Sequence, residues 1–76
     1  MKKEQNFPVI IERDKDGYFA YCPELQGCYT QGDTYEEALS NIKEVIALHV
    51  EDIQASGEDL PLQTESISLS TVGVLV

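Results

Sequence analysis

The side chains in this chain that could do chemistry are mostly carboxylates, and three of them occupy alternate positions at Glu12, Asp14 and Asp16. Alternate acids followed by Gly17 resemble the first half of a calcium-binding loop. Such a loop also needs a bidentate glutamate at its last position, where this chain has Pro23. We therefore interpret these acids as part of a solvated turn, and we predict no metal site there.

The remaining candidates are two cysteines and one histidine. Cys22 and Cys28 are too few for a zinc or iron–sulfur site, which usually takes four ligands, so we interpret both as small apolar strand residues. His49 falls within the apolar stripe of a predicted helix, where a hydrogen-bonded structural role is commoner than catalysis. No nucleophile context is recognisable. We predict no catalytic residue, no metal ligand and no cofactor, although acids converging from several elements on paired metal ions stay open as an alternative.

The composition favours a protein partner over a nucleic acid. The 76 residues carry 14 acids against 5 bases, a formal charge of −9. Nucleic-acid binding needs basic side chains that displace counterions, whereas a strongly acidic surface speeds encounter with a basic protein. No apolar run is long enough to span a membrane, so we expect a cytoplasmic protein. A single domain of this size, residues 1–76, buries little core, which predicts a homo-oligomer, either a dimer or a tetramer.

The elements that must position these side chains begin with three short strands. Residues 7–13 form a β-rich run, and residues 14–17 are typical of a tight turn. Residues 18–22 follow as a second strand and complete a hairpin. A Pro–Gly loop at residues 23–27 leads to a third strand at residues 28–31, which ends at Gly32 and Asp33.

A helix follows, and its start is the clearest local signal. Thr34 and Glu37 have the spacing of a capping box, and Gly57 is a natural C-terminal stop. Apolar residues between them recur at helical spacing and predict one buried stripe: Tyr35, Ala38, Leu39, Ile42, Val45, Ile46, Val50 and Ile53.

The C-terminal stretch alternates apolar and small polar residues. Ile67 and Leu69 lie between serines 66, 68 and 70, which predicts a fourth strand. The apolar phase then shifts to Val72, Val74 and Val76, which predicts a bulge or bend near Gly73. An apolar edge of this kind promotes association, so we expect it to pair with another subunit or to be buried in an interface. The predicted order is β-β-β-α-β, an α+β fold.

The order and spacing of several short motifs resemble one family, the HicB-type antitoxin domain. The motifs are Asp16-Gly17-Tyr18, the loop at residues 23–28, Gly32-Asp33-Thr34, the helix entry at residues 36–39, and residues 48–51 and 57–61. Together they cover roughly residues 7 to 62. The resemblance implies a partial ribonuclease-H-like fold in which an antiparallel sheet carries one long helix, without an intact nuclease centre.

The resemblance also implies a function. Antitoxins of this family bind a HicA-type toxin, a small basic ribonuclease that cleaves mRNA, and block its surface. Many relatives carry an additional C-terminal DNA-binding segment; this chain ends at Val76, so we expect no direct nucleic-acid binding by it. The alternatives are an orphan homo-oligomeric domain of the same kind and a metal-dependent nuclease on a ribonuclease-H-like frame.

The predicted toxin-binding residues come from the hairpin turn, the central loop and the strands. Acids that would steer a basic toxin are Asp14, Asp16, Glu24 and Asp33. Residues that would anchor the interface are Tyr18, Tyr21, Leu25 and Tyr29, with packing within the sheet as the alternative role for each.

Overall fold

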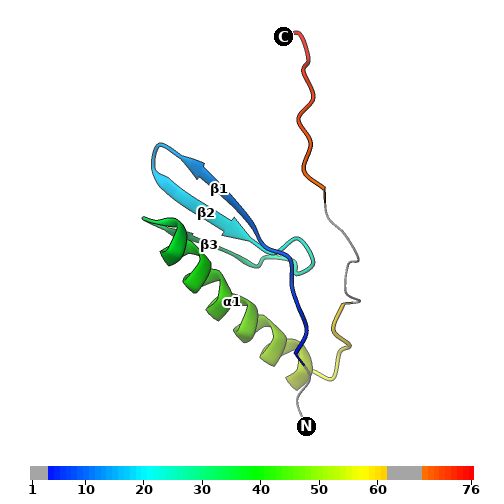
Figure 1. Ribbon diagram of the computed structural model, residues 1–76. Coiled ribbons are helices and arrows are strands. Elements are labelled where there is room, and N and C mark those ends of the chain that lie inside the picture. Colours follow the sequence, from blue (N-terminus) through cyan, green and yellow to red (C-terminus); the bar gives the residue numbers. More distant parts are fainter. Residues whose placement is uncertain (1–3, 62–67) are drawn as a thin grey trace.

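A computed structural model describes residues 4–61 and 68–76 of the chain. Within them the elements are β1 (Ile10–Asp14), β2 (Gly17–Tyr21), β3 (Tyr29–Gly32) and α1 (Tyr35–Ala55). The strands form an antiparallel sheet in the order β1-β2-β3, and α1 lies along one face of it (Figure 1). The predicted α+β class, with one long helix packed on an antiparallel sheet, is confirmed.

The first hairpin is closed by a turn in which one acid, Asp14, bonds to the backbone. Asp14 pairs with Gly17, and the Asp16 N–H donates to Asp14 Oδ1 at 2.8 Å. This bond gives Asp14 the turn role expected from its type. β1 begins at Ile10 rather than at Phe7, because its partner β2 ends at Tyr21, directly opposite Ile10. Residues 7–9 therefore have no β2 residue beside them.

The helix begins and ends where the sequence predicts, and the Thr34 half of the capping box is formed. At the start, the Glu37 N–H donates to Thr34 Oγ1 at 3.0 Å, and Thr34 has the extended backbone of an N-cap. At the end, Gly57 adopts a φ of 79° and its N–H donates to the Gln54 carbonyl at 3.2 Å. The helix is thus fixed at both termini by local bonds.

The core lies between the sheet and α1. The buried residues come from β2, the loop after it and the inward face of the helix: Ala20, Cys22, Leu25, Cys28, Ala38 and Ile42. The cysteines are core residues as expected, but each lies one position outside a strand. The two layers approach each other closely at Gly32, where a Cβ would lie 2.5 Å from the Ala38 backbone nitrogen. Glycine at this position allows β3 to lie directly on the first turns of the helix.

The fourth strand is not present in the described structure. Ser66 and Ile67 lie outside the described residues, and residues 68–76 form neither strand nor helix. Figure 1 shows them running away from the sheet, and Val72 and Val74 are among their exposed side chains. The prediction was wrong for residues 68–70 because alternating apolar residues make a strand only beside another strand. For the same reason the bulge predicted near Gly73 has no ladder in which to form.

Candidate functional site

Three of the predicted acids meet at one end of the molecule, where the β1–β2 turn lies beside the β3–α1 turn. Asp14, Asp16 and Asp33 line a single cleft of about 300 Å³ together with Glu37. We call these four residues the acidic end. No basic residue lines this cleft, although Arg13 and Lys15 line the neighbouring cleft that shares Asp14 and Asp33. Carboxylates still outnumber basic side chains here, so the acidic end presents net negative charge to solvent.

Backbone packing holds the acidic end in place. Tyr18 of β2 pairs with Gly32 of β3, which sets the two turns side by side. A Cβ on Gly17, whose φ is 132°, would lie 2.9 Å from the Gly32 carbonyl oxygen. The Thr34 cap then fixes the first turn of α1, and with it Glu37. The position of each acid therefore depends on the close approach of two glycines.

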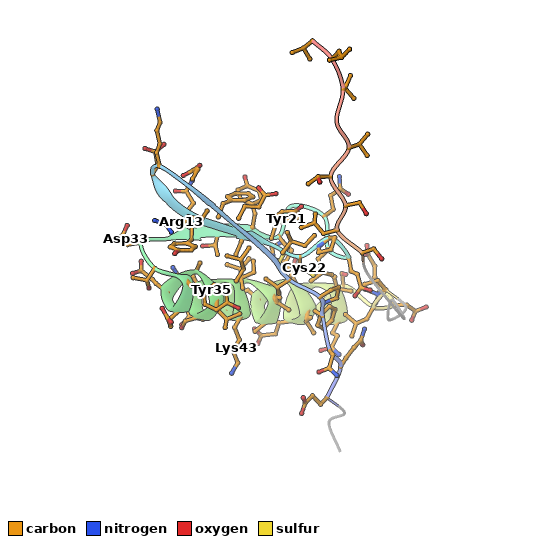
Figure 2. The ribbon with its side chains drawn as sticks, turned by 45° about the horizontal axis from the view of Figure 1, so that its top comes forward. Arg13, Tyr21, Cys22, Asp33, Tyr35 and Lys43 are labelled. Atoms are coloured by element: carbon orange, nitrogen blue, oxygen red, sulfur yellow. The ribbon has the colours of Figure 1, made fainter. Side chains whose placement is uncertain are left out.

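Tyr18 lies at this end as well, on the side of the sheet that α1 covers. Its ring meets Tyr35 edge-on with the ring centroids 6.5 Å apart. The Arg13 guanidinium carbon lies 5.9 Å from the Tyr18 ring centroid. Figure 2 shows Arg13, Asp33 and Tyr35 gathered at this end of the sheet and helix. Tyr18 thus packs within the fold and borders the acidic cleft.

A second surface lies on the opposite side of the sheet. Tyr21 and Tyr29 are paired across β2 and β3, and the Phe19 ring lies 5.8 Å from Tyr21 and 5.9 Å from Tyr29, centroid to centroid. We call these three residues the aromatic face. Strand residues alternate between faces, so Ala20 points into the core while Phe19 and Tyr21 point away from α1. In Figure 2, Tyr21 and Cys22 lie on opposite sides of the sheet.

The sequence reasoning did not select Phe19. The feature of the sequence that could have identified Phe19 is the alternation of side chains along a strand, which places Phe19 on the same face as Tyr21. In the sheet, Phe19 pairs with Gln31 of β3. Tyr29 is 61% exposed, so the aromatic face is open to a partner at that residue.

The two predicted residues of the central loop do not join either surface. Glu24 and Leu25 lie between β2 and β3, at the opposite end of those strands from the acidic turns. The Leu25 side chain is 5% exposed, and its N–H donates to the Cys22 carbonyl at 3.2 Å. Leu25 therefore packs in the core, where it fixes the loop instead of contacting solvent.

The thiols of Cys22 and Cys28 are both free and buried. The backbones of the two residues are hydrogen-bonded, with the Cys22 N–H donating to the Cys28 carbonyl at 3.0 Å. Burial, and secondarily the neighbouring Cys22, raises the pKa of the Cys28 thiol above 9.0. The unfolded chain then releases this proton more readily than the folded chain. The contribution of the protonated Cys28 thiol to the free energy of unfolding is therefore intact below pH 9. It is lost as the pH rises toward the pKa of the thiol in the folded chain.

We expect the free energy of unfolding to fall between pH 8 and pH 10 more steeply in the natural chain than in Cys28→Ala. Urea unfolding at a series of pH values measures both slopes. The variant also forms a small cavity, but that lowers stability at every pH and leaves the slope unaffected. Equal slopes would contradict the buried-thiol interpretation.

His49 has the structural role expected for it. Its Nδ1 lies 3.0 Å from the Val45 carbonyl oxygen on the preceding helical turn, which makes Nδ1 the donor. Within residues 4–61 and 68–76, no group of three or more His, Cys, Asp or Glu side chains is arranged to hold a metal ion. No helix within those residues is both long and apolar enough to cross a membrane.

Comparison with known proteins places these surfaces in a family context. Residues 7–72 match the sequence model of a family described as the HicB-like antitoxin of bacterial toxin–antitoxin systems. A UPF0150 protein of Synechocystis is 42% identical over 76 residues, covering 99% of this chain and 94% of that protein. A UPF0150 protein of Thermoplasma acidophilum is 46% identical over 56 residues, covering 72% of this chain and 81% of the relative.

A solved structure has the same fold. A chain of a HicA3 and HicB3 toxin–antitoxin complex superimposes with a TM-score of 0.65 and 28% sequence identity, covering 79% of this chain and 70% of that one.

Proposed function

This chain belongs to the HicB-like antitoxin family of bacterial toxin–antitoxin systems, and we propose that it neutralises a small, basic, HicA-like ribonuclease by binding it directly. The observation that carries the proposal is the family match over residues 7–72, which includes every residue of the acidic end and of the aromatic face. The structural likeness to a chain from a HicA3 and HicB3 complex supports the same kind of partner. We place the action in the cytoplasm, where the mRNA substrate of such a toxin is found.

The two surfaces would contribute to different steps of toxin binding. The acidic end would attract a basic toxin and orient it during encounter, since clustered like charge raises association rates. The aromatic face would supply the desolvated contacts that hold the complex together, since tyrosine is enriched among residues that dominate interface energy. In this scheme the protein acts by occlusion and has no catalytic role of its own.

Co-expression tests the proposal. The chain is produced together with the small reading frame adjacent to its gene, and growth and co-purification are scored. Rescue of growth from the toxic neighbour, with a stable complex, is the expected result. A neighbour that is not toxic, or toxicity that this chain does not relieve, would overturn the proposal.

Neutralising the acidic end is expected to slow toxin binding. In the triple variant Asp14→Asn, Asp16→Asn, Asp33→Asn, the association rate at low ionic strength should fall about tenfold, and its dependence on salt should become shallower. Asparagine keeps the side-chain acceptor that Asp14 offers to the Asp16 N–H. Stopped-flow association over a salt series gives both quantities.

A matched variant removes the same charge from other exposed sites. Glu44→Gln, Glu51→Gln, Glu58→Gln changes the formal charge equally but lies away from the acidic end, along and after α1. It should leave the association rate nearly unchanged. Equal slowing in both triple variants would mean that net charge alone steers the toxin.

One observation favours a second function, a homo-oligomeric interaction domain that acts without a toxin. The described C-terminal residues carry apolar side chains that are mostly exposed, among them Leu69, Val72 and Val74. Surface of this kind is typically covered by a partner. Self-association is compatible with the antitoxin role, and the co-expression result separates an orphan domain from an antitoxin.

A further inference from the structure

The sheet has a free edge at β1, and an apolar groove opens beside it. β1 is the first strand in the order β1-β2-β3, so its outer backbone groups have no neighbouring strand within the described residues. Between the segment that enters β1 and the exposed flank of α1 lies a groove of about 400 Å³. We call it the edge groove; it is lined mainly by Phe7, Val9, Leu39, Ile42, Lys43 and Ile46.

The edge groove is suited to an uncharged strand. Its lining is apolar apart from Lys43 and the polar residues at positions 5 and 6. Leu39 is 43% exposed there, although it belongs to the apolar stripe of α1. In Figure 2 the Lys43 side chain extends from α1 away from the sheet. A strand added beside β1 would bond to its free backbone groups and lay one row of side chains over Leu39 and Ile46.

The same chain contains a segment with matching properties. Residues 68–76 carry no charged side chain, and Val72, Val74 and Val76 alternate, so they share one face when extended. Val72 is 83% exposed, and no secondary structure forms in this segment. We call residues 68–76 the apolar tail. A basic toxin is a poor match for the edge groove, since the groove offers no carboxylate.

The route of the chain favours exchange between two copies. Gln5 Nε2 donates to the Pro61 carbonyl at 3.1 Å, which ties the chain leading to the tail next to the segment that enters β1. From the end of the described segment at residue 61, the tail lies directed away from its own sheet and helix (Figure 1). Each copy therefore carries an extended apolar segment and a free strand edge that could accept one. Reciprocal exchange of identical segments closes as a two-fold dimer.

We propose that the apolar tail of one copy adds to the β1 edge of a second copy, with Val72, Val74 and Val76 facing the partner's edge groove. This deepens the homo-oligomer part of the proposed function by naming the contact.

Light scattering coupled to size exclusion tests the exchange on the full chain without toxin. The natural chain should have twice the monomer mass of 8.5 kDa. The tail variant Val72→Asp, Val74→Asp should be monomeric. The control Thr71→Asp, Gly73→Asp adds the same charge on the opposite face, where a Cβ on Gly73 meets nothing within 4 Å, and should remain dimeric.

A mixing experiment identifies the acceptor. The groove variant Leu39→Glu, Lys43→Glu alters two exposed helix positions that line the edge groove, so its circular dichroism should match that of the natural chain while its mass is that of a monomer. An equimolar mixture of tail and groove variants should recover a dimer, because one intact tail meets one intact groove. A monomeric natural chain, a dimeric tail variant, or a mixture that stays monomeric would each overturn the proposal. None of these results bears on growth rescue, which tests the toxin separately.

Discussion

Replacing Gly32 with alanine is expected to lower the free energy of unfolding by about 3 kcal/mol, at the upper end of the usual cost of overpacking. A Cβ at this position would lie 2.5 Å from the Ala38 nitrogen and 2.9 Å from its Cα. Both are backbone atoms of α1, so the strain cannot be relieved by a side-chain rotation. Either β3 or the first turns of the helix must move.

The loss is large for a chain of this size, because small domains are stable by only about 0.05–0.15 kcal/mol per residue. Urea denaturation followed by circular dichroism measures it. The matched substitution Gly73→Ala adds the same methyl group where nothing lies within 4 Å, and it should change stability little. If Gly32→Ala were as stable as the natural chain, the close packing of β3 on α1 would be refuted.

Gly32 also illustrates what sequence reasoning recovers. Local signals were sufficient for the hairpin turn, for the Thr34 cap and for the stop at Gly57, because each depends on residues a few positions apart. Gly32 itself was interpreted only as the end of a strand. Its main role depends on the distance between two layers, and that distance is not encoded in any short stretch.

For the candidate surfaces, too, local sequence predicted individual residues but not how the fold arranges them. Turn residues such as Asp14 and Asp33 were predicted individually, and β-pairing then brings them together. For Leu25 the sequence left an interface contact and packing within the fold both open, and its burial in the core, held by loop hydrogen bonds, favours packing. The fourth strand failed for a related reason: alternation specifies which side chains share a face, but a strand also needs a neighbour. The sequence alone did not predict how the elements pack on one another or how one copy of the chain contacts another.

Replacing Tyr29 with alanine is expected to weaken toxin binding about 30-fold, which corresponds to about 2 kcal/mol and to the loss of one dominant interface residue. Tyr29 is 61% exposed, and its ring packs beside Phe19 on the sheet face away from α1. The ring offers a large apolar area that is already held in place by its neighbour. Little side-chain entropy is therefore lost when a partner covers it.

Isothermal titration with the purified toxin gives the dissociation constant. The control is Leu48→Ala, because Leu48 is 64% exposed on α1 and so matches Tyr29 in exposure but lies on neither candidate surface. Both variants should unfold close to the natural chain, since exposed side chains contribute little to stability. Tyr29→Phe distinguishes the ring from its hydroxyl: near-natural binding would assign the effect to apolar contact.

Variants of the two surfaces are expected to change different rate constants, so kinetic measurements show which surface contributes to which step of binding. Loss of Tyr29 should raise the dissociation rate and leave the association rate nearly unchanged, because short-range packing acts after encounter. Neutralising the acidic end should do the reverse. If Tyr29→Ala bound as tightly as the natural chain, the aromatic face would not be part of the interface. The toxin would then be held at the acidic end alone, and its affinity would fall steeply with salt.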